Sequence, residues 1–227
     1  MVYSNGPSIV RDGLVLHLDA ADRNSYPLSG NTWYDLSGNG YNGTLTNGPV
    51  FNNGNHGYIG FDSTDDYIQL SESSAFNTNK FTIEMFLKTQ EVLSNTQYYG
   101  FFSTINGNNG FQLFWHSSMY FYLYVGAIVA TTTVGIISSN TWLHLAATYD
   151  ASNLNNVAIY VNNTRYAGTT VGTYNPGIAP RIIGRRADST YDFHFACNFH
   201  YTRFYNRALS SSEVLQNYNA TKGRFGL

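Results

Sequence analysis

The chain has 227 residues, of which 11% are charged and 16% aromatic, with 19 Tyr and 15 Phe. This length fits one large β-sandwich or two small domains, and the shortage of Lys and Glu beside many Tyr, Phe and Thr favours strands over helices. The formal net charge of −2 provides no basic face, which argues against nucleic acid as a partner.

Short apolar runs separated by Gly, Asn and Ser recur along the chain, a rhythm typical of a two-sheet sandwich or a barrel. In chain order the predicted strands are residues 14–18, 58–61, 67–70, 81–88, 101–104, 111–125, 142–149, 157–161, 181–184 and 191–205. Residues 19–55 contain several turn signals and are expected to be rich in loops. The inward-facing set of the run 81–88 is expected to be Phe81, Ile83, Met85 and Leu87.

One helix is predicted near the C-terminus. Ser210 and Glu213 have the spacing of a capping box, in which each side chain accepts a backbone N–H of the other residue. The apolar face of the helix is expected to consist of Val214, Leu215 and Tyr218. Residues 221–227 are expected to follow as an extended tail.

The single cysteine and the N-terminal sequence bear on where the chain folds. Because Cys197 is the only cysteine, an intramolecular disulfide is impossible, which excludes a disulfide-stapled secreted scaffold. The first residues lack a basic segment followed by an apolar run, so no signal peptide is expected. No run of about 18 apolar residues is present, so no membrane span is expected. Folding in a reducing cytoplasm is predicted.

Several segments resemble the laminin-G-like, concanavalin A-like lectin/glucanase domains found in bacteriophage structural proteins. These are GLVLHLDAAD (13–22), WYDLSGNGYNGTL (33–45), IGFDSTDDYIQL (59–70), FTIEMFLK (81–88), WLHLAATYD (142–150) and FYNRALSSSEVLQNYNATKGRFG (204–226). The resemblance implies a jelly-roll sandwich of two antiparallel sheets with a concave face. With the helix predicted above, the expected fold is an all-β sandwich with one short C-terminal helix. The sandwich is expected to span residues 13–227, after an N-terminal arm of residues 1–12.

Glucanases share this fold, and glycoside hydrolysis needs two carboxylates close together. The family's Glu-x-Asp-x-(x)-Glu arrangement is absent from the sequence, and Glu84 stands alone on its strand. Nucleophile and zinc motifs are absent as well. The expectation is therefore that the chain is not an enzyme, with a glycoside hydrolase of the same fold as an alternative.

Acidic residues crowd the loops of the first third of the chain and offer oxygen ligands of the kind that Ca²⁺ prefers. The calcium candidates are Asp19, Asp35, Asp62 and Asp65. The alternative interpretation is structural: carboxylates before Ser-Gly or within a hairpin turn commonly accept hydrogen bonds from the turn backbone. Both interpretations stay open, and no other cofactor is expected.

The segment 111–125 is predicted to be a hairpin with aromatic side chains on both faces. One face carries Phe111, Leu113, Trp115, Phe121, Leu123 and Val125. The other carries the candidate ligand-binding residues Phe114, His116, Tyr120, Tyr122 and Tyr124, together with Gln112. Because only one face of a hairpin can join the core, the second face lines a sugar-binding groove, lies under a loop, or contacts a partner.

These features lead to the hypothesis of a virion protein of the fibre, collar or capsid-decoration kind. It would be assembled in the host cytoplasm and would present a lectin-like domain to host surface glycans. Its expected partners are other capsid or tail proteins and host glycans, and self-association into a homo-oligomer is left open. The alternative is a structural protein that binds the capsid or tail and no glycan.

Overall fold

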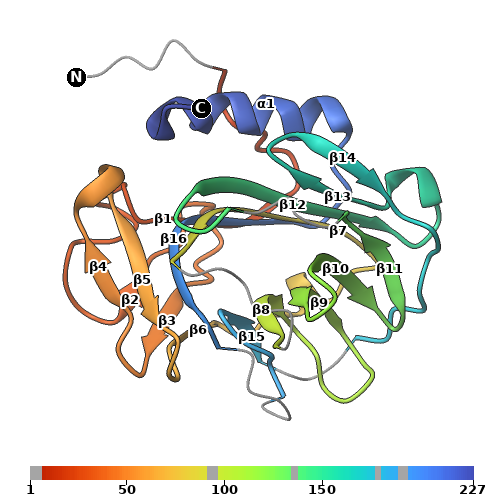
Figure 1. Ribbon diagram of the computed structural model, residues 1–227, viewed down its shortest axis with the longest axis horizontal. Coiled ribbons are helices and arrows are strands. Elements are labelled where there is room, and N and C mark those ends of the chain that lie inside the picture. Colours follow the sequence, from red (N-terminus) through yellow and green to blue (C-terminus); the bar gives the residue numbers. More distant parts are fainter. Residues whose placement is uncertain (1–6, 91–96, 134–137, 177–179, 189–193) are drawn as a thin grey trace.

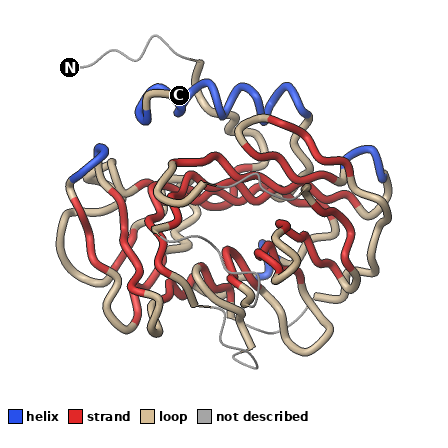
Figure 2. Tube along the Cα trace, viewed as in Figure 1, coloured by secondary structure: helices blue, strands red, loops and turns tan. Residues whose placement is uncertain are grey.

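Two antiparallel sheets lie face to face and enclose the core, with one helix outside them, as Figures 1 and 2 show. The computed structural model describes residues 7–90, 97–133, 138–176, 180–188 and 194–227. This arrangement confirms the predicted all-β sandwich with a short C-terminal helix. Among the described residues, no helix is both long and apolar enough to cross a bilayer.

Eight strands make up the sheet beneath the helix, called sheet A. In spatial order they are β14 (Thr164–Ala167), β13 (Ala158–Val161), β12 (Trp142–Asp150), β7 (Lys80–Thr89), β16 (Ala196–Tyr205), β5 (Tyr58–Asp62) and β4 (Val50–Asn52), with β1 (Leu14–Asp19) also paired to β16. The predicted run 191–205 begins as a strand only at Ala196, and its residues 191–193 lie outside the described part of the chain.

The second sheet, called sheet B, also has eight strands. In spatial order they are β11 (Ile128–Thr131), β10 (Tyr120–Val125), β9 (Phe111–His116), β8 (Tyr99–Ser103), β15 (Arg181–Ile183), β6 (Tyr67–Leu70), β3 (Gly43–Thr46) and β2 (Thr32–Trp33). The stretch 19–55, predicted to be loop-rich, also holds the short strands β2, β3 and β4, which the sequence did not single out. These strands have two to four residues each, too few to show a period of two.

The core between the sheets is dominated by stacked aromatic rings. The predicted inward residues of β7 are all fully buried. At its centre the ring of Phe81 stacks on Phe111 from sheet B, with centroids 4.1 Å apart. Phe204 from β16 lies parallel to both rings at about 6 Å. Because β7 and β16 of sheet A meet β9 of sheet B at this stack, the core fixes which face of β9 points outward.

Helix α1 (Ser211–Thr221) begins at the predicted capping box and lies over the outer face of sheet A (Figure 1). The Ser210 side chain accepts the backbone N–H of Glu213, whose carboxylate accepts that of Ser210 at 2.8 Å. Val214 is buried as predicted, but Leu215 is 39% exposed. The expectation for Leu215 is wrong because the helix turns the amide of Asn217, fully buried, towards the sheet instead.

Short 3₁₀ helices connect several strands: η1 (Gly54–His56), η2 (Ser74–Phe76), η3 (Leu154–Asn156) and η4 (Lys222–Phe225). The last of these corrects the expected extended tail, because the chain continues from α1 into η4. There Phe225 stacks on Phe86 of β7, with ring centroids 3.8 Å apart. That contact holds the C-terminal turn against sheet A.

Near the other end of the chain, Val10 of the expected N-terminal arm is buried and donates its N–H to Asn217 Oδ1 at 2.8 Å.

A buried polar cluster joins α1 to sheet A around the carboxylate of Glu84, which is 1% exposed. Glu84 pairs with His144 Nε2 at 2.8 Å, with Asn217 Nδ2 at 2.9 Å and with Arg203 Nη1 at 3.4 Å. Burial alone would raise the pKa of Glu84, but the charge of Arg203 and the hydrogen bond from His144 lower it below its ordinary value. Glu84 therefore stays ionised and ties the helix to the sheet.

Candidate functional site

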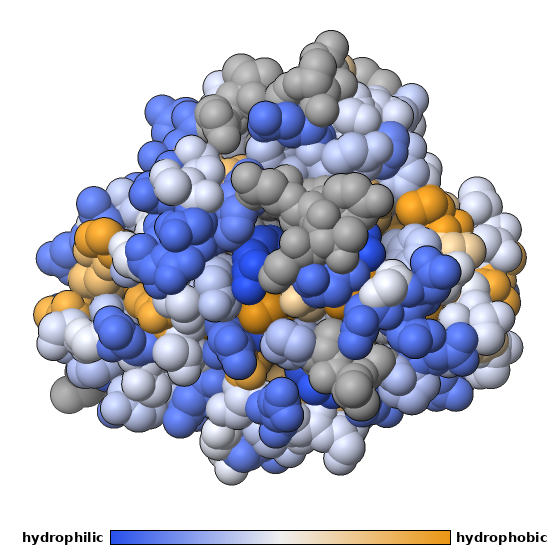
Figure 3. All heavy atoms as spheres, turned by 90° about the horizontal axis from the view of Figure 1, so that it is seen from below, coloured by the Kyte–Doolittle hydropathy of each residue, from blue (hydrophilic) through white to orange (hydrophobic). Residues whose placement is uncertain are grey.

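A groove of about 460 Å³ opens on the face of sheet B that points away from the core. Seen from that side, hydrophobic residues form separate areas on a mainly hydrophilic surface (Figure 3). The described residues that line the groove are Tyr98, Gly107, Asn108, Gln112, Phe114, His116, Tyr124, Ile128 and Arg186. They come from β9, β10, β11 and the segments next to β8 and β15, so the groove crosses several strands of the sheet.

The hairpin of β9 and β10 places the aromatic side chains on this face. Its strands pair in register from Tyr120 opposite His116 to Val125 opposite Phe111, with a turn at residues 117–119. Because successive strand residues alternate between faces, Phe111, Leu113 and Trp115 enter the core. Their counterparts Phe121, Leu123 and Val125 are also buried. This alternation confirms the predicted two-faced hairpin.

Four outward residues of the hairpin, Phe114, His116, Tyr120 and Tyr122, form a continuous aromatic row. The ring of Tyr122 stacks on Phe114 at 5.6 Å, contacts His116 at 4.7 Å and meets Tyr120 edge-on at 6.0 Å. Tyr98 adds an edge contact to His116 at 4.7 Å. Ring contacts of this kind hold side chains in fixed orientations, so the row presents a preorganised surface.

The five predicted binding residues thus share one face. Phe114, His116 and Tyr124 line the groove, whereas Tyr120 and Tyr122 lie beside it along the row. Their role in binding stays a prediction.

His116 is held as a neutral imidazole at the edge of the groove. Its Nδ1 accepts the backbone N–H of Ser118 at 3.0 Å, which requires that this nitrogen carry no proton. Burial lowers the pKa of His116 below its ordinary value, in agreement with that geometry. The remaining proton lies on Nε2, so the ring offers one donor and no charge at neutral pH.

Two polar side chains among the lining residues that the binding-site prediction did not include are Gln112 and Arg186. Gln112 is 2% exposed, and its amide Nε2 is buried without an acceptor among the described residues. Arg186 is paired with Asp188 through two hydrogen bonds, of 2.6 and 2.9 Å. Arg186 Nη2 also donates to the carbonyl oxygen of Gly107 at 3.2 Å. The groove therefore combines aromatic rings with amide groups and one neutralised ion pair.

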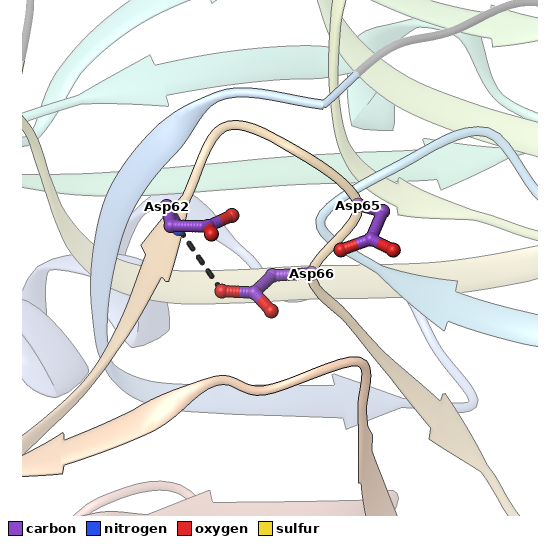
Figure 4. A group of neighbouring side chains, drawn as sticks. All are labelled: Asp62, Asp65 and Asp66. Carbon is purple, nitrogen blue, oxygen red and sulfur yellow. Dashed lines mark hydrogen bonds between the residues drawn. The ribbon is translucent and has the colours of Figure 1, made fainter.

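Three carboxylates gather in the turn between β5 and β6, shown in Figure 4. One oxygen from each of Asp62, Asp65 and Asp66 lies within 4.8 Å of the others. Asp66 Oδ2 accepts the N–H of Asp62 at 3.0 Å, while its Oδ1 is buried and has no donor in the described part of the chain. Burial raises the pKa of Asp66, and the neighbouring charges of Asp62 and Asp65 add to this effect. These oxygens are of the type that Ca²⁺ prefers.

The other two calcium candidates lie elsewhere and already have partners. Asp19 is buried and forms an ion pair with Arg224 at 2.8 Å. Asp35 accepts the backbone N–H groups of His17 and Ser37, each at 2.9 Å. These hydrogen bonds are those of the structural alternative to a calcium site. The four predicted residues are thus not brought together, and calcium stays a prediction for Asp62 and Asp65, joined by Asp66.

The geometry defines a lectin-like sandwich with an aromatic groove on one sheet. A model of the family described as the concanavalin A-like lectin/glucanases superfamily matches residues 62–215, more than half of the sequence. The chain belongs to this family. A search of curated proteins finds no match.

Solved structures resemble the chain at low sequence identity. The Trypanosoma rangeli sialidase in complex with sialic acid matches 93% of the chain at TM-score 0.69 and 17% identity. The binding domain of Paraclostridial Mosquitocidal Protein 1 matches 92% at TM-score 0.70 and 19% identity. The receptor binding domain of botulinum neurotoxin type G matches 91% at TM-score 0.64 and 16% identity. The chain spans 33% of the sialidase and about half of the other two. At such identities the likeness shows the fold alone.

The expectation that the chain is not an enzyme is corrected by these matches, because structures with its fold include sialidases as well as binding domains. The missing Glu-x-Asp-x-(x)-Glu motif excludes one pattern of catalytic carboxylates. It does not exclude other enzymes of this fold. Glu84, the lone glutamate of its strand, does not lie in the groove. Its carboxylate is enclosed between α1 and sheet A, on the opposite side of the sandwich from the groove.

Proposed function

We propose that the chain is a recognition module that binds glycans in the groove of sheet B. The observation that carries this proposal is the preorganised aromatic row, which meets a groove containing amide groups. Tyrosine and phenylalanine rings offer flat apolar faces for the C–H side of a pyranose, and amides offer hydrogen bonds for its hydroxyl groups. Membership of the lectin/glucanase superfamily supports the same ligand class, although fold alone does not assign one.

The proposal extends to a place on a virion, as part of a fibre, a collar or a capsid decoration that contacts host surface glycans. Its support is the resemblance of six segments to domains of bacteriophage structural proteins. A charged fraction of only 11% also fits a surface packed against many neighbouring copies, because long-range repulsion between them is weak. On this proposal the chain is assembled in the host cytoplasm and acts from the particle. Two solved structures that share its fold are the binding domain of Paraclostridial Mosquitocidal Protein 1 and the receptor binding domain of botulinum neurotoxin type G.

A second candidate function is protein docking within the virion without glycan binding. The observation that favours it is the position of Tyr120 and Tyr122, which extend the aromatic row beyond the groove. Tyrosine is enriched at protein interfaces because its ring is apolar and its hydroxyl group can form hydrogen bonds. On this reading the row would be covered by a capsid or tail protein.

The experiment is a glycan array probed with the wild-type chain, with Tyr124→Ala in the groove, and with Tyr34→Ala as the matched control. Tyr34 is 44% exposed and does not line the groove. Glycan binding by the wild type and by Tyr34→Ala, lost in Tyr124→Ala with unchanged thermal unfolding, supports the proposal. An array without signal, together with saturable binding to capsids or tails that lack the chain, would favour docking instead.

A further inference from the structure

The charge balance of the groove bears on which glycans it accepts. Among the described residues that line it, Arg186 is the only one with a permanent positive charge. Its guanidinium is occupied by Asp188, with Nε 2.6 Å from Oδ1 and Nη2 2.9 Å from Oδ2. Asp188 Oδ2 also accepts the N–H of Gly107 at 3.1 Å. The ion pair is therefore fixed against the loop that enters β9.

An anionic sugar would meet this ion pair at a cost. A carboxylate that binds the Nε–Nη2 edge of Arg186 would have to displace Asp188 from it, and two negative charges would then lie side by side. The side chains of Arg186 and Asp188 are only 18% and 9% exposed, so water compensates poorly for a lost partner. His116 does not supply a replacement charge, because its Nδ1 is an acceptor for Ser118.

The lining of the groove instead matches a polar ligand without charge. Gln112 contributes an Nε2 donor that is buried and has no acceptor among the described residues. A buried donor without a partner costs free energy. A ligand oxygen that accepts its hydrogen bond therefore contributes more binding free energy than an oxygen that binds an exposed amide. Hydroxyl and acetamido oxygens of neutral sugars are acceptors of this kind, and the ring of Phe114 on the same strand face offers an apolar contact beside it.

We propose that the groove selects uncharged glycans, with Gln112 as the specificity-determining donor and the Arg186–Asp188 pair as the barrier to acidic ones. This inference rests on the proposed glycan-binding function and names its ligand class. The Trypanosoma rangeli sialidase, whose structure was solved with sialic acid, shares only the fold with this chain. Its acidic ligand is therefore no argument for an acidic ligand in this groove.

The experiment compares neutral glycans with the same glycans carrying a terminal sialic acid, on an array and then by calorimetry with the strongest pair. The inference predicts that the neutral member binds at least about tenfold more tightly. It also predicts that neutral binding changes little between about 50 and about 300 mM NaCl, because no net charge is neutralised. Equal or tighter binding of the sialylated member overturns the inference and leaves the proposed function standing. Binding of neither class overturns both.

Two substitutions test the named residues. Gln112→Leu removes the unpartnered donor at similar volume, so folding is retained while neutral-glycan affinity falls about tenfold. The matched control is Gln69→Leu, an exposed glutamine of β6 in the same sheet that does not line the groove. Asp188→Asn keeps an acceptor for Gly107 but removes the negative charge that lies 2.6 and 2.9 Å from the guanidinium of Arg186, so sialylated glycans should gain about tenfold. Unchanged selectivity in both Gln112→Leu and Asp188→Asn would overturn the assignment.

Discussion

Removing the charge of Glu84 is predicted to destabilise the whole sandwich. Its carboxylate is the counter-ion of Arg203, which is 1% exposed and lies 3.9 Å from the ring of Tyr201. Glu84→Gln keeps the size of the side chain and leaves Arg203 as a buried charge without an anion. Breaking a buried pair in this way costs about 3–5 kcal/mol. For a chain of this length, that corresponds to a fall in Tm of roughly 6–20 °C.

The assay is thermal and urea unfolding followed by circular dichroism. The matched control is Glu72→Gln, an exposed carboxylate, which should change the free energy of unfolding by less than about 0.5 kcal/mol. The double substitution Glu84→Gln/Arg203→Met removes both charges and should recover part of the loss. A fall in Tm below about 2 °C for Glu84→Gln would refute the reasoning, because the cluster would then contribute no more than a surface pair.

The remaining predictions concern acid stability, calcium and the core. Burial lowers the pKa of His200 to about 4 and of His17 to about 3. Because the unfolded state binds these protons near pH 6.5 and the folded state does not, stability should fall as pH drops from about 6.5 to about 4. His200 alone contributes about 2 kcal/mol of loss at pH 5; a flat urea-unfolding profile from pH 8 to pH 5 would contradict this. Calcium at ten times its Kd should stabilise the chain by about 1.4 kcal/mol in a thermal-shift assay, an effect absent in Asp66→Asn; no shift in the wild type would remove the calcium prediction. Phe204→Ala should cost about 3–5 kcal/mol in urea unfolding, since its fully buried ring fills the aromatic stack; a loss below about 1 kcal/mol would show that the stack repacks.

The β9–β10 hairpin shows what the sequence could predict. Alternation with a period of two is a local property of a strand, so the inward and outward sets of residues 111–125 could be assigned before any pairing was known. The capping box of α1 was predictable for the same reason, since Ser210 and Glu213 are three residues apart. The fold class followed from the rhythm of short strands and from the family resemblance.

Other parts of the site depend on pairings between distant segments. Tyr98, Ile128 and Arg186 reach the groove only because β8, β11 and β15 lie near β9 in sheet B, and nothing local in the sequence indicates that order. Gln112 could be placed on the outward face but not recognised as a buried donor without a partner. The period alone did not show which neighbours enclose it.

The prediction that Leu215 packs on sheet A is wrong because the contacts between the helix and the sheet are partly polar. Hydrophobic periodicity assigns Leu215 to the sheet, but Asn217 faces sheet A and donates to Glu84. A pattern that scores only apolar residues cannot anticipate a buried carboxylate opposite the helix. The carboxylates of Asp19 and Asp35 were ambiguous for a related reason, since an Asp in a turn and an Asp in a metal site have the same local sequence.

A crystal structure of the chain soaked with its tightest-binding neutral oligosaccharide tests the central claim most directly. The account predicts a sugar ring against Phe114 and Tyr124 on the outer face of sheet B, with one of its oxygens within hydrogen-bond distance of Gln112 Nε2. The Arg186–Asp188 pair would remain closed. Sugar density confined to the β5–β6 turn, to the surface of α1, or to any other site with the groove empty would contradict it.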